Sequence, residues 1–203
     1  MKKYAVLHEP GDIVTLAGTR FVVLDVERRG SLPDSLFLLA LESVGASEFG
    51  SSNNYAESDL KKAVDKWLED MGKRGLDNAK LIPREIDLTT LDGSGCYGKL
   101  SVKAAPLTLD EAREYADIIP NAERWCWLAT GWSGPSKSDG DSALCVYSNG
   151  DWYGGSCSGS YGIRPALKIP SDLLLDSADK PDLSEVPTDT LLEEIRRRVV
   201  DKA

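Results

Sequence analysis

The residues with the most reactive side chains in this chain are four cysteines and a single histidine. The cysteines are Cys96, Cys126, Cys145 and Cys157, and their spacings of 30, 19 and 12 residues match no CxxC pattern of a structural zinc site. Reduced thiols are the default without a secretory signal. We therefore expect free, partly buried cysteines that act as small apolar groups.

Hydrolytic and metal chemistry have little support in the sequence. His8 is the only histidine, and it lies in an N-terminal arm, so a Ser-His-Asp triad has no other base to use. Asp139, Asp141 and Asp151, together with Asn149, offer oxygen ligands of the kind that calcium prefers. A solvated acidic loop explains the same residues, and we favour it. We expect no catalytic residues, no metal and no cofactor.

The richest stretch runs from Arg124 to Ile169 and holds four of the five tryptophans. Between Tyr147 and Tyr161 nearly every residue is Tyr, Ser, Gly, Asn, Asp or Cys, which approaches the composition of an antibody paratope. An ordinary exposed Gly/Ser loop is the alternative. The candidate ligand-binding residues are Trp132, Tyr147, Asn149, Asp151, Trp152, Tyr153, Ser156, Ser158 and Tyr161.

A hairpin should present these side chains. Asn149-Gly150 is the strongest two-residue turn signal in the chain. It predicts that Tyr147 faces Trp152, that Cys145 faces Gly154, and that Val146 and Tyr153 share the other side. We expect Trp132 to be exposed, and one face of the pair Trp125 and Trp127 to be core.

Arg164, in Gly162-Ile163-Arg164-Pro165-Ala166-Leu167, allows two interpretations. It is either a ligand clamp or, as we favour, a residue that sits in the sheet and bonds nearby carbonyls. The strand Ile163–Ile169 should lie at a sheet edge or carry a bulge, because Pro165 lacks an N–H donor.

The elements beneath this stretch follow from apolar periodicity. Segments 12–16, 20–26 and 36–41 read as strands of an antiparallel meander, with a break at 28–34. Ser58 caps a helix with an apolar stripe that includes Trp67 and ends near Gly72 and Gly75. Strands or irregular crossings are expected at 81–88 and 99–102, and Thr108 with Glu111 forms a capping box for a second helix that stops before Pro120.

Charge and hydropathy exclude several partner classes. The formal charge is −9 with a pI near 4.7, which disfavours nucleic acid and anionic membranes as partners. No apolar run is long enough for a transmembrane helix, and the N-terminus lacks the apolar core of a signal peptide. We therefore expect the protein in a bacterial cytoplasm or a phage virion.

The composition changes after Ile169. We expect one α+β domain over 1–169, an acidic Ser/Pro-rich linker over 170–187 and an amphipathic helix over 188–203. A helix of about 14 residues is marginal alone. It should dock on its own domain, on a second copy of the chain or on a partner, and we favour a partner or a second copy.

An ordered set of motifs resembles an uncharacterised phage- and prophage-associated domain family with a C-type-lectin-like fold. The matching motifs are Gly11-Asp12-Ile13-Val14, Val23-Leu24-Asp25-Val26, Ser58 with Leu60 and Trp67-Leu68, Leu107 with Glu111, Ala112 and Tyr115, Trp125 to Gly131, and Gly162 to Leu167. The resemblance covers about residues 11 to 169. Ala129 and Thr130 depart from it, since the family has Arg and Ser there.

The resemblance implies antiparallel sheets with two helices and a scaffold used by ligand binders, including the variable proteins of diversity-generating retroelements. Most residue types between Tyr147 and Tyr161 are reachable by scrambling the first two bases of an Asn codon, and Trp152 would be a fixed position. The E-P-N and Q-P-D patterns of calcium-dependent lectins are absent. The function expected is non-catalytic recognition of a protein or glycan.

Two alternatives stay open. The chain could be a structural or assembly component of a virion, attached through 188–203. It could also be a cysteine-dependent copper oxidase of the formylglycine-generating type, which belongs to the same fold family. That chemistry requires two cysteines to share copper, and the hairpin register above does not make Cys145 and Cys157 cross-strand partners.

Overall fold

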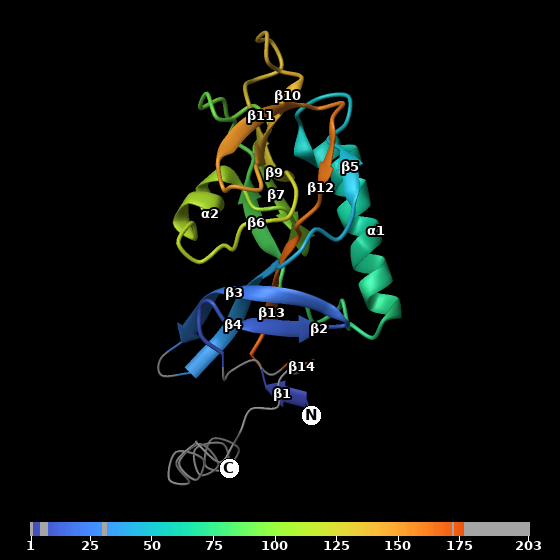
Figure 1. Cartoon of the computed structure of the whole chain (residues 1–203), viewed down its shortest axis with the longest axis vertical. Helices are drawn as coiled ribbons and strands as arrows, with labels where there is room; N and C mark the ends of the chain where they lie inside the picture. Colours follow the sequence, from blue (N-terminus) through green and yellow to red (C-terminus); the bar gives the residue numbers. More distant parts are fainter. Residues whose placement is uncertain (1, 5–7, 30–31, 172, 177–203) are drawn as a thin grey trace.

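The computed structural model describes residues 2–4, 8–29, 32–171 and 173–176. Over these residues it is a mostly β-sheet α+β protein with two α-helices, as the sequence predicts. Figure 1 shows the large sheet at one end of the molecule and a smaller sheet toward the other end, with α1 and α2 on opposite sides of the smaller one.

The large sheet has seven strands in the order β1-β14-β2-β3-β4-β13-β8. All its pairings are antiparallel. The strands are β1 (Lys2–Tyr4), β2 (Ile13–Leu16), β3 (Thr19–Arg29), β4 (Leu32–Ala40), β8 (Ala104–Ala105), β13 (Ala166–Pro170) and β14 (Leu174–Asp176).

The predicted meander is confirmed, with one correction. Strands β2, β3 and β4 are neighbours, and Ala17 and Gly18 make a two-residue turn with φ of 47° and 76°. Positive φ at both positions suits the twist of a tight hairpin. The predicted break at 28–34 is wrong, because β3 continues to Arg29 and β4 begins at Leu32. Irregular register at two points lets these long strands stay paired.

The small sheet has five strands in the order β11-β10-β9-β12-β5. Its central strand β9 is buried along its whole length, so its side chains supply core on both faces. A further pair, β6 and β7, forms a separate antiparallel ribbon. These strands are β5 (Ala46–Glu48), β6 (Arg84–Asp87), β7 (Lys99–Val102), β9 (Cys126–Gly131), β10 (Ser142–Val146), β11 (Trp152–Ser156) and β12 (Ser160–Gly162).

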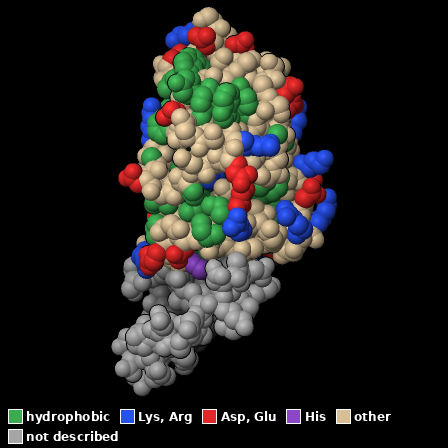
Figure 2. All heavy atoms as spheres, in the orientation of Figure 1, with side chains coloured by type: hydrophobic (Ala, Val, Ile, Leu, Met, Phe, Trp, Pro, Cys, Tyr) green, Lys and Arg blue, Asp and Glu red, His purple; other side chains and the backbone are tan. Residues whose placement is uncertain are grey.

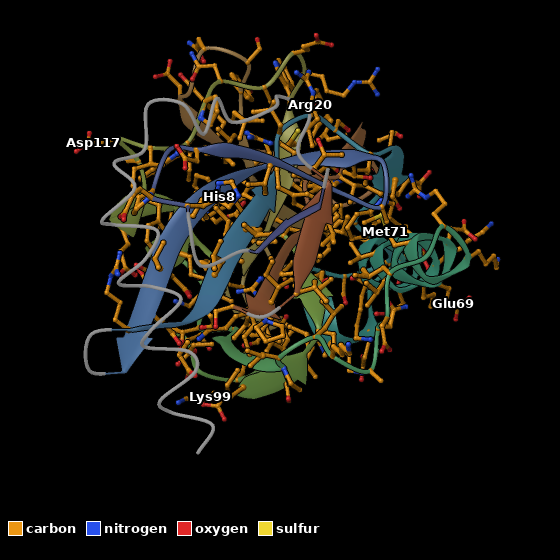
Figure 3. All side chains as sticks on the ribbon, turned by 90° about the horizontal axis from the view of Figure 1, so that it is seen from below. His8, Arg20, Glu69, Met71, Lys99 and Asp117 are labelled. Atoms are coloured by element: carbon orange, nitrogen blue, oxygen red, sulfur yellow. The ribbon has the colours of Figure 1, made fainter. Side chains whose placement is uncertain are left out.

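Helix α1 (Asp59–Lys73) follows a 3-10 turn, η2 (Tyr55–Glu57), and forms where its stripe predicts. The Ser58 hydroxyl accepts from Lys61 N at 2.9 Å, as a cap should. The helix ends at Lys73, and just beyond it Gly75 has a φ of +104°, which lets the amides of Gly75 and Leu76 turn back onto the last carbonyls. Figure 3 shows Met71 turned toward the sheets and Glu69 turned away from them.

Helix α2 (Leu109–Glu114) has both bonds of the predicted capping box between Thr108 and Glu111. It is shorter than the sequence suggested and gives way to turns from Tyr115 onward. Thr130 on β9 accepts from Leu109 N at 2.9 Å. Thr130, one of the two residues that depart from the pattern of the similar family, therefore anchors the start of α2.

The two sheets are joined where two segments cross side by side. The chain leaves β4 through residues 41–45 and returns to β13 through residues 163–165. Backbone bonds link them: Val44 N donates to Ile163 O, Ile163 N to Gly45 O, and Ala40 N to Pro165 O, all at 2.9 to 3.0 Å. The prediction for Pro165 is wrong, because it precedes β13, which has β4 and β8 as neighbours on both sides.

The large sheet also extends past the expected domain end at Ile169. Strand β14, inside the range predicted as a linker, pairs with β1 and β2. The predicted helix at 188–203 lies outside the described residues.

One buried amide ties the loops beside the small sheet together. The Asn53 side chain is fully buried and donates to Ser133 O at 2.8 Å and Ser142 O at 2.9 Å, while its oxygen accepts from Tyr97 Oη at 2.6 Å. Three bonds at one side chain fix the loop before α1 against the ends of β9 and β10.

We predict that Asn53→Ala lowers the free energy of unfolding by about 2–4 kcal/mol, because buried polar groups lose their partner. Urea denaturation with the exposed Asn121→Ala as a control provides the measurement. Equal losses in the two variants would contradict this role for Asn53.

Candidate functional site

The β10–β11 hairpin carries most of the candidate residues, and its register differs from the prediction by one residue. Cys145 pairs with Tyr153 and Val146 pairs with Trp152. The loop has three residues rather than two, because Tyr147 N donates to Asp151 O at 2.8 Å and Gly150 N donates to Tyr147 O at 2.9 Å. Gly150 has a φ of +92°, as such a loop requires at its last position.

Adjacent glycines on β11 let large rings lie flat against both faces of the strand. A Cβ on Gly155 would stand 2.4 Å from the Tyr161 ring, and a Cβ on Gly154 would stand 2.6 Å from the Trp132 ring. The two rings therefore occupy the space that side chains would fill on opposite faces. Trp132 is half-buried here, so the expectation that it is exposed is wrong.

On the face of β11 that Tyr161 covers, three aromatic rings form a continuous stack. The ring centroids of Trp125 and Tyr147 lie 3.9 Å apart, and the two ring planes differ by 10°. The ring centroids of Tyr147 and Tyr153 lie 4.5 Å apart, with planes that differ by 9°. The Tyr161 ring packs edge-on against Trp125 with 5.6 Å between the ring centroids, and its centroid lies 4.4 Å from that of the buried Trp127. We call Trp125, Tyr147, Tyr153 and Tyr161 the aromatic face.

Much of this face is open to solvent. Trp125 is 41% exposed and Tyr153 is 51% exposed. Hydrophobic side chains gather on the surface over β10 and β11 (Figure 2). Tyr147, Tyr153 and Tyr161 also carry hydroxyl groups. The face thus combines fixed apolar area with polar groups at its surface.

An open hollow adjoins the aromatic face. Its volume is about 370 Å³, and Trp125 and Tyr161 contribute to its wall. Glu123 and Arg124 add one charge of each sign, and hydroxyl groups complete the lining. The lining residues are Glu123, Arg124, Trp125, Ser148, Ser160, Tyr161 and Gly162.

Trp132 and Trp152 do not join this face, and the polar candidates bond mainly to one another. Trp152 is 37% exposed on the opposite side of β11, where the Arg113 guanidinium lies 5.6 Å from its ring. Asn149 donates to Asp151 at 2.7 Å within the turn. Ser156 and Ser158 bond each other at 3.0 Å. Strand alternation separates Trp152 from Tyr153, so the nine candidates do not form one surface.

Trp125 is the residue that the sequence reasoning missed as a binding candidate. We expected one face of the Trp125 and Trp127 pair to be core, and Trp127 is indeed buried at 1% exposure. Trp125 precedes β9 and escapes the core. The pair Gly154-Gly155 signals the close approach of Trp132 and Tyr161 rather than of Trp125, since glycines on a strand mark the approach of another group.

The cysteines are free thiols, and three of them are buried. Burial raises the pKa of Cys126 and of Cys145 to about 11 and that of Cys157 to about 12. Cys96 is exposed. A raised pKa keeps a thiol protonated at neutral pH, and the thiolate is the form that attacks or binds metal.

Arg164 behaves as the favoured interpretation predicts, with one exception. It is 6% exposed; its Nε donates to Ala40 O at 3.0 Å and its Nη1 to Pro120 O at 3.1 Å. Its Nη2 is buried and has no hydrogen-bond partner.

Within the described ranges, no group of three or more His, Cys, Asp or Glu side chains is placed to hold a metal ion. No helix of the described residues combines the length and apolarity needed to cross a bilayer.

Comparisons with protein-family models, with curated proteins and with solved structures found no match to this chain.

We predict that Gly155→Ala destabilises the protein by about 1–3 kcal/mol and alters the near-ultraviolet circular dichroism of the aromatic face, because the added methyl overlaps Tyr161. Gly95→Ala is the matched control, since a Cβ there meets nothing within 4 Å. An unchanged spectrum in Gly155→Ala would contradict the packing described.

We also predict that one thiol, Cys96, reacts rapidly with an aromatic disulfide reagent at about pH 8, and that the other three react only on unfolding. Counting thiols with and without denaturant, in wild type and in Cys96→Ser, measures this. Fast reaction of a thiol in Cys96→Ser would show that a buried cysteine is accessible after all.

Proposed function

We propose that this chain is a non-catalytic recognition protein that binds a protein or glycan ligand through the aromatic face. The observation that carries the proposal is the Trp125–Tyr147–Tyr153 stack, which leaves large rings exposed yet holds them in place. Isolated exposed aromatics are ordinary, but contiguous aromatic surface marks an interaction site.

Rigidity is the physical argument for recognition. Ring pairs of this kind contribute about 0.5–1.5 kcal/mol beyond area burial. Rings already held by one another lose little side-chain freedom when a ligand arrives, which lowers the cost of binding. Tyr also offers a hydroxyl beside its ring, so one residue type supplies both contact area and hydrogen bonds.

The stack favours a protein ligand over a glycan as the main partner. Stacking of a sugar needs an open ring face, and both faces of Tyr147 are occupied by Trp125 and Tyr153. The face then offers ring edges, tyrosine hydroxyls and the exposed parts of Trp125 and Tyr153, a mixture that suits a protein surface. The hollow beside Trp125 is where a glycan would find its own contacts.

The proposal includes the fold type and setting that the resemblance implies. We propose a C-type-lectin-like domain of phage or prophage origin. In its support, the motifs that carry the resemblance lie in elements of the expected kind and order: β2, β3, α1, α2, β9 and β13. Retroelement diversification is part of the proposal, and a reverse-transcriptase gene beside this one, with a near-copy of its 3′ coding end, is its test.

We predict that Trp125→Ala and Tyr153→Ala each weaken ligand binding by about 2 kcal/mol, roughly thirtyfold, as truncation of a central aromatic does in other interfaces. Glycan and protein arrays probed with the full chain identify the ligand class. Ile13→Ala, an exposed apolar residue on β2, serves as the control.

Signal on the protein array that falls in both aromatic variants and persists in Ile13→Ala supports the proposal in its favoured form. Signal confined to the glycan array would move the site to the hollow. Binding that survives both aromatic truncations would overturn the aromatic face as the site.

A further inference from the structure

A second cavity lies on the other side of β11, between the two sheets and α2. Its volume is about 100 Å³. Most of its lining is apolar and comes from β4, the α2 region, β9, β10 and β11. The walls include Leu39, Leu107, Ala112, Leu128, Val146 and Trp152.

One cation lines this otherwise apolar cavity. Arg164 belongs to the lining, and its side chain is 6% exposed. Its two bonds go to backbone carbonyls, which carry no net charge, and its Nη2 has no partner. Within the described part of the chain, Arg164 forms no ion pair.

A second buried arginine, Arg84, shows what is missing at Arg164. Arg84 is also buried, at 9% exposure, but it pairs with the carboxylate of Glu111 and bonds Ala105 O at 3.0 Å. Besides the Cys126 thiol, the acidic group that acts on Arg164 is Glu42, which is already paired with Arg20. Burial lowers the pKa of Arg164, as it does for a cation removed from water.

A buried charge without a counter-charge is costly, so such groups are normally paired. Guanidinium has a strong preference for carboxylates, which accept two parallel hydrogen bonds. The apolar walls add a preference for a hydrocarbon part. We infer that this cavity binds a short-chain monocarboxylate, with its carboxylate paired to Arg164 and its alkyl chain against the apolar walls.

The volume limits the length of the chain. An apolar cavity of about 150 Å³ holds benzene, so a cavity of this size suits an acid of roughly three to five carbons. A second cation supports entry of an anion, because Arg113 lies over the Trp152 ring that lines the cavity.

Trp152 is the side chain that must move for the acid to reach Arg164. Nη2 is sealed from solvent, so a lining group has to shift before a ligand can contact it. Among the large lining side chains, Trp152 is exposed, at 37%, and its ring contact is with Arg113 on the surface. This site is independent of the aromatic face, which lies on the other side of β11.

The test is an NMR titration of the full chain with butyrate, with the neutral isostere butyramide and with butylammonium. We expect saturable shifts at the amides of Val146 and Gly150 and at the Trp152 indole. Butyrate should bind at least about tenfold more tightly than butyramide, as expected for hydrogen bonds to a charged group. Butylammonium should not bind.

Ala116→Leu tests the location. Ala116 is exposed and lines the cavity, so a larger side chain there should block it with little effect on stability. The expected result is a loss of butyrate binding of at least about tenfold in this variant and no change in Ala79→Leu, a leucine at another exposed alanine. Arg164→Met should abolish the preference for butyrate over butyramide.

Three results would overturn the inference: equal binding of butyrate and butyramide, no saturable shift in the millimolar range, or full binding in Ala116→Leu. If Arg164→Met does not fold, the ligand series and Ala116→Leu still decide the matter. None of these outcomes depends on the array experiments with Trp125→Ala and Tyr153→Ala.

Discussion

The side-by-side crossing of two chain segments between the sheets is the constraint on which the rest of this structure depends. Residues 41–45 leave the large sheet next to residues 163–165, which return to it, and backbone bonds link the two segments. Arg164 reinforces the crossing with bonds to Ala40 O and Pro120 O. The small sheet, and everything it displays, is held in place through this junction. A large, desolvated cation at this junction is costly unless its donors are satisfied.

Local signals in the sequence were sufficient where one physical preference dominates. The capping box at Thr108 and Glu111, the Ser58 cap and the meander of β2, β3 and β4 are all present as predicted. Each depends on short-range hydrogen bonding or on apolar alternation, which neighbouring residues determine. The part of the large sheet beyond Ile169 was harder to predict, because the pairing of β14 with β1 and β2 joins residues that are far apart in the sequence.

The sequence predicted which residue types make up the candidate site, but it did not predict how they are arranged in space. Asn149-Gly150 suits a two-residue turn, and the same residues also fit the three-residue loop that forms here. The difference of one residue decides which side chains share a face. Trp132 was misassigned for a related reason: its exposure depends on where the ring finds room, and that room lies at Gly154, on another strand. The buried Nη2 of Arg164 is likewise a property of the tertiary arrangement, and no spacing in the sequence shows it.

The register of β11 is what allows one hairpin to carry two different surfaces. Trp152 and Tyr153 are neighbours in sequence, yet alternation sends one toward the apolar cavity and the other to the aromatic stack. A slip of one residue would exchange them and would also place Gly154 and Gly155 against the wrong rings. Because Trp132 and Tyr161 each fill the space beside one of these glycines, the slipped register would leave gaps under both rings and clashes beside them. Ring packing on both faces therefore fixes the register more firmly than the turn does. It also explains why the glycines, which contribute no contact of their own, determine what each surface can bind.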